Sequence, residues 1–182
     1  MTRPRSTNAA LQGLLREVRA CTICAAHLPL PPRPVLQAGA AARILIAGQA
    51  PGRKVVASGV PFDDASGDRL RAWMGIDKAA FHDPDFIAIL PMGFCYPGTG
   101  ASGDLPPRPE CAATWRERLL EQLPSIELTL VISTYAQAWH LKPAGGGASL
   151  TATVAAWREH GARVLPLPHP SPRNNGWLQR NP

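Results

Sequence analysis

The sequence predicts an α/β fold, a three-layer α/β/α sandwich around a mostly parallel sheet that is covered on both faces. Short apolar runs alternate with segments of helical periodicity along the chain, and this alternation is typical of parallel strands joined by helices. Polar loops rich in Gly and Pro follow two of the apolar runs, at the strand ends where open α/β sheets bind ligands. The length of 182 residues fits a single domain over 1–182.

Each element follows from its own side-chain pattern. Apolar residues at helical spacing predict a first helix over about 8–20, and Ser66 is expected to cap a shorter helix that carries Leu70. The expected strands are 43–47, 86–90, 128–132 and 163–167, and the other expected helices are about 110–122, 134–141 and 151–160. The segment 92–110 is too proline-rich for either state and predicts a long, structured loop, a feature that is usually functional. Gly145-Gly146-Gly147 predicts a flexible turn.

Composition narrows the functional class. The formal net charge of +6 suits an anionic partner such as nucleic acid, although a solvated basic surface explains it equally well. No apolar run approaches the ~18 residues of a membrane span, and no signal peptide is visible, so we expect a cytoplasmic monomer. The sequence contains neither a P-loop nor a G-x-G-x-x-G motif, which argues against a nucleotide hydrolase. The chain ends at Asn181-Pro182 without a predicted terminal helix, which suggests a shortened C-terminus.

Four cysteines form a candidate metal site. Cys21 and Cys24 form a C-x-x-C at the end of the first helix, and Cys95 and Cys111 lie at the two ends of the proline-rich loop. Disulfides are rare in the cytoplasm, whereas both zinc and a [4Fe–4S] cluster take four cysteines. The wide spacing of the second pair favours the cluster over zinc, and four unrelated buried thiols are the remaining alternative. The metal would fasten the first helix to the loop.

Two loops are the candidate ligand site. The first loop, Gly48-Gln49-Ala50-Pro51-Gly52, follows the strand 43–47, and the second loop, which runs from His169-Pro170-Ser171 to Asn175, follows the strand 163–167. The carboxyl ends of parallel strands meet at one edge of a sheet, so the two loops are expected to face each other across one site.

These motifs occur in one order over nearly the whole chain, and together they resemble the uracil-DNA glycosylase superfamily, in particular its iron–sulfur branch called family 4, with a divergent first motif. The ordered set is Cys21-x-x-Cys24, Gly48-Gln49-Ala50-Pro51-Gly52, Pro61-Phe62, Cys95-x15-Cys111 and His169-Pro170-Ser171. The resemblance implies a four-stranded parallel sheet, a [4Fe–4S] cluster on the four cysteines, and a flipped nucleotide between the two loops. Flipping suits such chemistry because an enzyme that acts on a base must take it out of the stack.

The resemblance also implies roles for individual residues. His169 would stabilise the negative charge on the departing base, Phe62 would stack on that base, and Gln49 and Ala50 would offer it backbone N–H groups. Ser171 would contact a phosphate, and Asn174 a phosphate or a base, unless it only shapes the turn. Arg173 stands at the position of a wedge that fills the gap left by the flipped base, where it would insert or neutralise a phosphate.

Three positions depart from the family. The family carries a Glu at the position of Gln49, other glycosylase branches place a water-activating Asp at Ala50, and an Asn that reads uracil stands at Pro91. Asp63 and Asp64 directly follow Phe62, so our hypothesis is that one of them activates or orients the attacking water. The alternative is that this pair caps the following helix, where acidic groups are favoured.

Two functions follow. The first is a DNA repair glycosylase that hydrolyses the N-glycosidic bond of uracil or a related deaminated base. The second is an iron–sulfur protein of glycosylase fold that binds DNA containing uracil or another damaged base without cleaving it, and the neutral residues at positions 49, 50 and 91 favour it.

Overall fold

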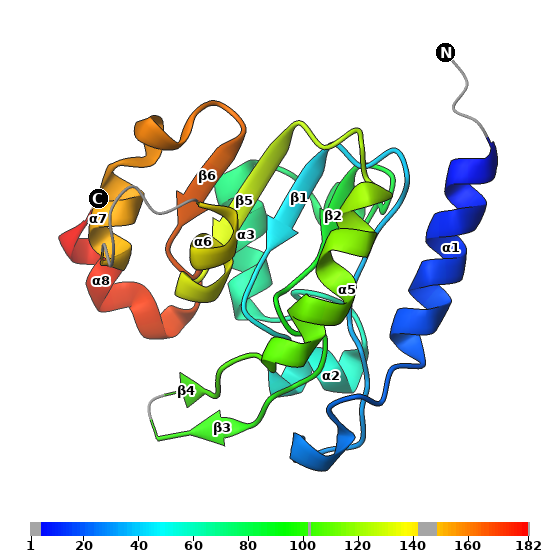
Figure 1. Cartoon of the computed structure of the whole chain (residues 1–182). Helices are drawn as coiled ribbons and strands as arrows, with labels where there is room; N and C mark the ends of the chain where they lie inside the picture. The colour runs from blue at the N-terminus through cyan, green and yellow to red at the C-terminus, as the bar shows by residue number, and fades with distance from the viewer. Residues whose placement is uncertain (1–4, 102, 142–148, 182) are drawn as a thin grey trace.

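The computed structural model describes residues 5–101, 103–141 and 149–181, and its centre is a four-stranded parallel sheet (Figure 1). The strand order is β2-β1-β5-β6, and every neighbouring pair is parallel. The bounds are Ile87–Ile89 for β2, Ile44–Ala47 for β1, Leu128–Ile132 for β5 and Val164–Leu167 for β6. The predicted α/β class and its parallel sheet are therefore confirmed.

Helices cover both faces of the sheet because successive side chains of a strand point to opposite faces (Figure 1). On β1, Leu45 packs in one apolar cluster with α1 (Arg5–Arg19) and α5 (Pro109–Glu121). Its neighbour Ile46 packs in a second cluster with α3 (Ala65–Met74) and α4 (Lys78–Phe81). The chain thus forms the three layers that the sequence predicts.

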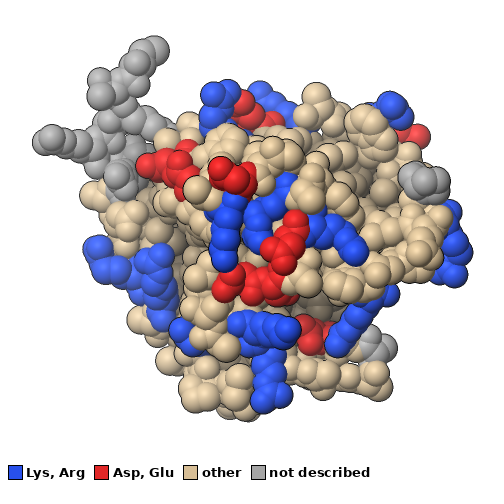
Figure 2. Space-filling view, turned by 180° about the vertical axis from the view of Figure 1, so that it is seen from behind, with Lys and Arg blue, Asp and Glu red and all other residues tan. Residues whose placement is uncertain are grey.

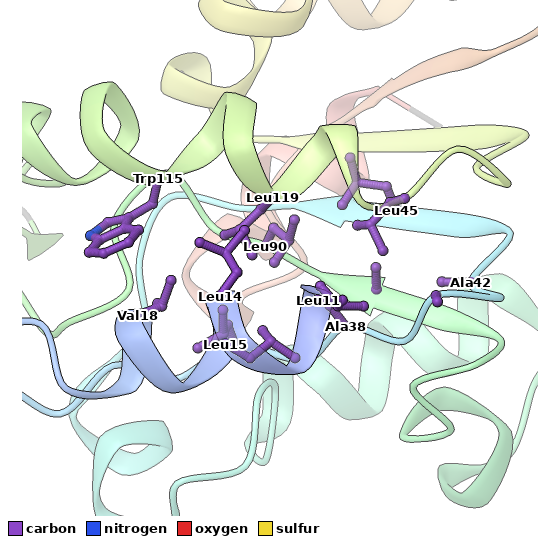
Figure 3. Close-up of a cluster of buried hydrophobic side chains, with 14 of the residues drawn as sticks. Leu11, Leu14, Leu15, Val18, Ala38, Ala42, Leu45, Leu90, Trp115 and Leu119 are labelled. Carbon is purple, nitrogen blue, oxygen red and sulfur yellow. The ribbon is translucent and has the colours of Figure 1, made fainter. Parts of the chain in front are cut away.

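Helix α1 is held by its apolar stripe, as Figure 3 shows. Leu11, Leu15 and Val18 are fully buried in one cluster with Leu119 of α5 and side chains of the sheet. Burying a side chain of this size contributes about 1.5–3 kcal/mol. The N-terminal helix is thus docked through apolar contacts, in addition to any metal at its C-terminal end.

Several predicted elements differ in detail. The predicted helix 151–160 is divided into α7 (Leu150–Ala155) and the 3-10 helix η2 (Trp157–His160), whereas α6 (Thr134–His140) agrees with the sequence. The Gly145–Gly147 turn lies outside the described residues. Further short elements that the sequence did not reveal are α2 (Arg53–Ser58), α4 and the 3-10 helices η1 (Ala25–His27) and η3 (Pro172–Asn174).

Three predictions were wrong. Ser66 does not cap α3; Asp64 does, and its Oδ1 accepts a hydrogen bond from the N–H of Gly67 at 2.9 Å. The proline-rich segment contains an antiparallel hairpin of β3 (Thr99–Gly100) and β4 (Gly103–Asp104), whose strands are too short to show a periodicity. A terminal helix is also present, because α8 spans Asn175–Arg180.

Candidate active site

The two predicted loops lie at the carboxyl edge of the sheet. The first loop (48–52) follows β1 and the second loop (169–175) follows β6. The carbonyls of Gly48 and Gln49 accept hydrogen bonds from the N–H groups of Met92 and Gly93, each at 2.9 Å, so the first loop is also tied to the segment after β2. The N–H groups of Gln49 and Ala50 have no hydrogen-bond partner in the described part of the chain.

Phe62 covers the first loop. Its ring is half-buried and meets Phe81 edge-to-face with centroids 6.0 Å apart. A methyl group on Gly48 would lie 3.8 Å from Phe62 Cζ. The backbone of Phe62 has a φ of +55°, a conformation that non-glycine residues rarely adopt and that clusters at functional sites. Packing against Phe81 therefore holds this ring in place beside Gly48 of the first loop.

His169 is held as a neutral hydrogen-bond donor. Its Nδ1 accepts a hydrogen bond from the N–H of Ser171 at 3.2 Å, so the proton of the neutral ring is on Nε2. Burial lowers the pKa of His169 below its ordinary value, and the carboxylates of Asp64 and Asp104 offset part of this effect. At neutral pH the ring can therefore donate through Nε2–H without carrying a charge.

The second loop is braced from within and from α3. The side-chain amide of Asn174 donates to the carbonyl of His169 at 2.8 Å, and Ser171 Oγ accepts from the N–H of Arg173 at 3.3 Å. Arg69 of α3 donates to the carbonyls of Pro170 and Ser171, both at 3.2 Å. Asn174 and Ser171 thus shape the loop that presents His169, whereas the side chain of Arg173 is exposed.

The acidic pair after Phe62 has structural partners. Asp63 forms an ion pair with Lys78 at 2.9 Å, and this hydrogen bond lowers the pKa of the Asp63 carboxyl. Asp64 caps α3, as its acidic position ahead of the helix suggested. Only Asp64 of the two acts electrostatically on His169.

A carboxylate that the sequence did not single out, Asp104 of β4, also lies at this edge. A methyl group on Gly52 of the first loop would lie 3.6 Å from Asp104 Oδ2. Gln49 Nε2 donates to the carbonyls of Leu105, at 3.0 Å, and Asp104, at 3.4 Å. A methyl group on Gly103 would lie 3.5 Å from Arg173 Nη1 of the second loop. The β3–β4 hairpin therefore contacts both loops, an arrangement that no local sequence pattern reveals.

Arg116 lies behind Pro91. The residue is 1% exposed, and its guanidinium donates through Nη1 to the carbonyls of Leu90, at 3.0 Å, and Pro91, at 3.3 Å. Its Nη2 contacts His140 Nε2, and its Nε has no partner among the described residues. Burial, and then the nearby Arg116 charge, lower the pKa of His140 to about 3.

The four cysteines line one pocket, together with Phe94, Arg108, Trp115 and several prolines. Two sulfurs already accept hydrogen bonds at 3.3 Å, Cys111 Sγ from the N–H of Phe94 and Cys21 Sγ from Trp115 Nε1. Within the described ranges, no three Cys, His, Asp or Glu side chains converge closely enough to enclose a single metal ion. All four cysteines lie around this one pocket, so they are the residues that would hold a metal ion or cluster there.

Burial opposes the thiolate form of these cysteines. It raises the pKa of Cys111 to about 12 and also raises the pKa of Cys24 and Cys95. The negative charges of the neighbouring cysteines reinforce each of these shifts. Four thiolates in this pocket would be stabilised by a bound cationic centre, because metal binding favours the deprotonated ligand.

Charge is mixed on the face opposite the view of Figure 1. Figure 2 shows Lys and Arg side chains intermingled with Asp and Glu side chains there. The net charge of +6 is therefore not gathered into a continuous basic stripe on this face.

An open parallel sheet with two polar loops at its carboxyl edge, one carrying His169 and the other beside the ring of Phe62, places a candidate ligand site where open α/β sheets bind ligands. A sequence model of the Uracil DNA glycosylase superfamily matches residues 37–182. The chain belongs to this superfamily, and its general function is that of a glycosylase for uracil or damaged bases in DNA. The match begins after Cys21 and Cys24, so it does not cover that half of the cysteine site. No helix in the described parts of the chain is long and apolar enough to cross a membrane.

Proposed function

We propose that this protein is an iron–sulfur DNA glycosylase, similar to family 4, that hydrolyses the N-glycosidic bond of uracil or a related deaminated base. The observation that carries the proposal is the geometry of His169, a half-buried side chain whose Nδ1 accepts the N–H of Ser171, so that Nε2–H is the donor it can offer. A preorganised donor of this kind is most effective where negative charge develops in a water-poor site.

The reaction places that charge on the base. As the bond between C1′ and the base breaks, its electron pair leaves with the base, and an oxygen of uracil becomes more negative. His169 Nε2–H donates a hydrogen bond to this oxygen, and the unpartnered N–H groups of Gln49 and Ala50 are further donors at the same edge. Removing one donor of this type typically costs about 10²–10³-fold in rate.

The ring of Phe62 positions the base. Phe62 stands against Gly48 of the first loop, where its ring can stack on a flipped pyrimidine, and such stacking contributes about 1–3 kcal/mol per base. Arg173 is the exposed cation of the second loop and is suited to the gap or the phosphates beside the flipped nucleotide. Ser171 and Asn174 act by holding the loop, and they reach DNA only through their remaining hydrogen-bonding capacity.

The cluster would have a structural role. Cys21, Cys24, Cys95 and Cys111 would hold a [4Fe–4S] cluster, with zinc as the alternative metal, because the four side chains line one pocket. When bound, the cluster joins the end of α1 to the two ends of the loop that carries the β3–β4 hairpin. It takes no part in bond cleavage, which depends on residues of the two loops.

A second function is favoured by one observation. Pro91 offers no side-chain donor, and its carbonyl is already engaged by Arg116, so uracil cannot be read there by an amide. A protein that binds a damaged base in DNA without excising it is therefore the alternative.

Base release separates the two functions. The holoprotein is incubated with single- and double-stranded oligonucleotides that carry uracil, hypoxanthine or xanthine, and the free base is identified by mass spectrometry. We expect a free base and an alkali-sensitive strand. Binding to damaged DNA without any released base would reject the enzyme and favour the binding protein.

A further inference from the structure

We propose that Asp104, on β4 of the hairpin, is a catalytic carboxylate that accepts the proton of the attacking water. The inference rests on the proposed glycosylase function and adds a residue to its site. The first loop has no acidic side chain, so a water placed there needs a proton acceptor from another segment.

Asp104 lies where it can accept the proton of such a water. Its Oδ2 would lie 3.6 Å from a methyl group on Gly52, which places the carboxylate directly against the first loop. Its charge also acts on His169 of the second loop. Asp104 therefore stands between the two loops, beside the site where the base would be held.

The side chain is also available. Among the described residues, the carboxylate of Asp104 forms neither a hydrogen bond nor an ion pair. Asp63 is engaged by Lys78, and Asp64 is occupied by the N–H of Gly67. Of these three acidic side chains, Asp104 is the one whose two carboxylate oxygens both lack a partner among the described residues, whereas Asp63 and Asp64 each have Oδ1 engaged.

Gln49 explains how the hairpin is held in place. Its amide donates to the carbonyls of Leu105 and Asp104, and a carboxylate at the same position has no hydrogen to donate. A neutral amide in the first loop therefore allows a carboxylate from the hairpin to approach it. Gln49 is a positioning residue for Asp104.

The step balances as a hydrolysis. The water oxygen forms a bond to C1′ while the bond from C1′ to the base breaks, and the electron pair of that bond leaves with the base, stabilised by His169. The proton of the water passes to Asp104, which later returns it to solvent, and the base anion takes up one proton. General-base assistance of this kind is typically worth about 10²–10⁴-fold.

The test compares Asp104→Asn with a matched control, Asp83→Asn, under single-turnover conditions on uracil-containing DNA. Asp83 lies ahead of β2, at the amino edge of the sheet, where its exposed carboxylate accepts the N–H of Asp85 at 3.0 Å. We expect base release to slow by about 10²-fold or more in Asp104→Asn and to be unchanged in the control. Affinity for DNA with an unreactive 2′-fluoro-2′-deoxyuridine should stay at the wild-type value in both variants.

Two further readouts separate catalysis from a structural role. Added formate should restore part of the rate of Asp104→Ala, because a small carboxylate can replace the missing acceptor, and the Gln49→Glu variant should be slower than wild type because its hairpin is undocked. A rate for Asp104→Asn equal to wild type, or a rate loss matched by an equal loss of affinity, would overturn the assignment while leaving the glycosylase function intact. If the wild-type protein releases no base, the proposed function fails and the assignment fails with it.

Discussion

The Gly67→Ala substitution tests how the backbone of α3 fixes the position of Phe62, the residue proposed to stack on the base. A Cβ at position 67 would lie 1.8 Å from the carbonyl oxygen of Phe62 and 2.9 Å from Phe62 Cβ. Ordinary carbon contacts begin at about 3.5 Å, so the overlap is large, and a backbone carbonyl cannot rotate away as a side chain can. The Phe62 segment must therefore shift, and Phe62 moves away from Gly48.

Two opposing effects determine how much Gly67→Ala changes the free energy of unfolding. Ala is favoured over Gly within a helix by about 1 kcal/mol, whereas forced overpacking costs typically about 1–3 kcal/mol. The contact at 1.8 Å lies at the severe end, so we expect a net loss of about 1–2 kcal/mol in the free energy of unfolding. For a chain of this size that corresponds to a decrease of about 2–8 °C in Tm.

The assay is thermal unfolding followed by circular dichroism, together with affinity for DNA carrying unreactive 2′-fluoro-2′-deoxyuridine. Gly13→Ala in α1 is the control, because its Cβ would meet only the flexible Arg16 Nη2 at 3.8 Å, and we expect it to stabilise the protein slightly. If Gly67→Ala were as stable as wild type and bound the DNA equally well, the packing argument for Phe62 would be refuted.

Three further predictions concern pH and the cysteines. Base release should fall on acidification below the ordinary histidine pKa of about 6.5, because burial lowers the pKa of His169 and protonation of its Nδ1 breaks the hydrogen bond from Ser171. A pH–rate profile that stays flat down to the pKa of ordinary carboxylates would contradict this. The pKa of His140 in the folded protein is about 3, so its neutral form contributes fully to the free energy of unfolding above about pH 6.5. This contribution, about 3–5 kcal/mol, should be lost as the pH falls toward 3. Urea unfolding should therefore show a smaller loss of stability in acid for His140→Gln than for wild type. Anaerobically purified protein should be brown with about four iron and four sulfide per chain, and Cys111→Ala should lose both; zinc without iron in the wild type would reject the cluster.

The sequence predicted the sheet because its signal is local. Each strand is a short apolar run, and the helix stripe of Leu11, Leu15 and Val18 is read directly from spacing. The two loops were also found from sequence, because each follows a strand and the carboxyl ends of parallel strands meet at one edge.

The third segment at the site was not predictable by the same reasoning. Asp104 reaches the first loop through a hairpin with two residues per strand, docked by a side chain that is 56 positions from Leu105. Arg69 and Arg116 were missed for a similar reason, since each acts on carbonyl groups of a distant segment. Among these features, only the cap at Asp64 could be predicted from the local sequence, because two adjacent acidic residues directly precede a helix.

The most direct test of the central claim is the single-turnover rate of uracil release by wild type and His169→Ala, measured by rapid quench with affinity for unreactive DNA determined in parallel. We expect a rate lower by about 10²–10³-fold in His169→Ala with little change in affinity, because His169 acts on charge that develops only as the bond breaks. Equal rates in the two proteins would contradict it.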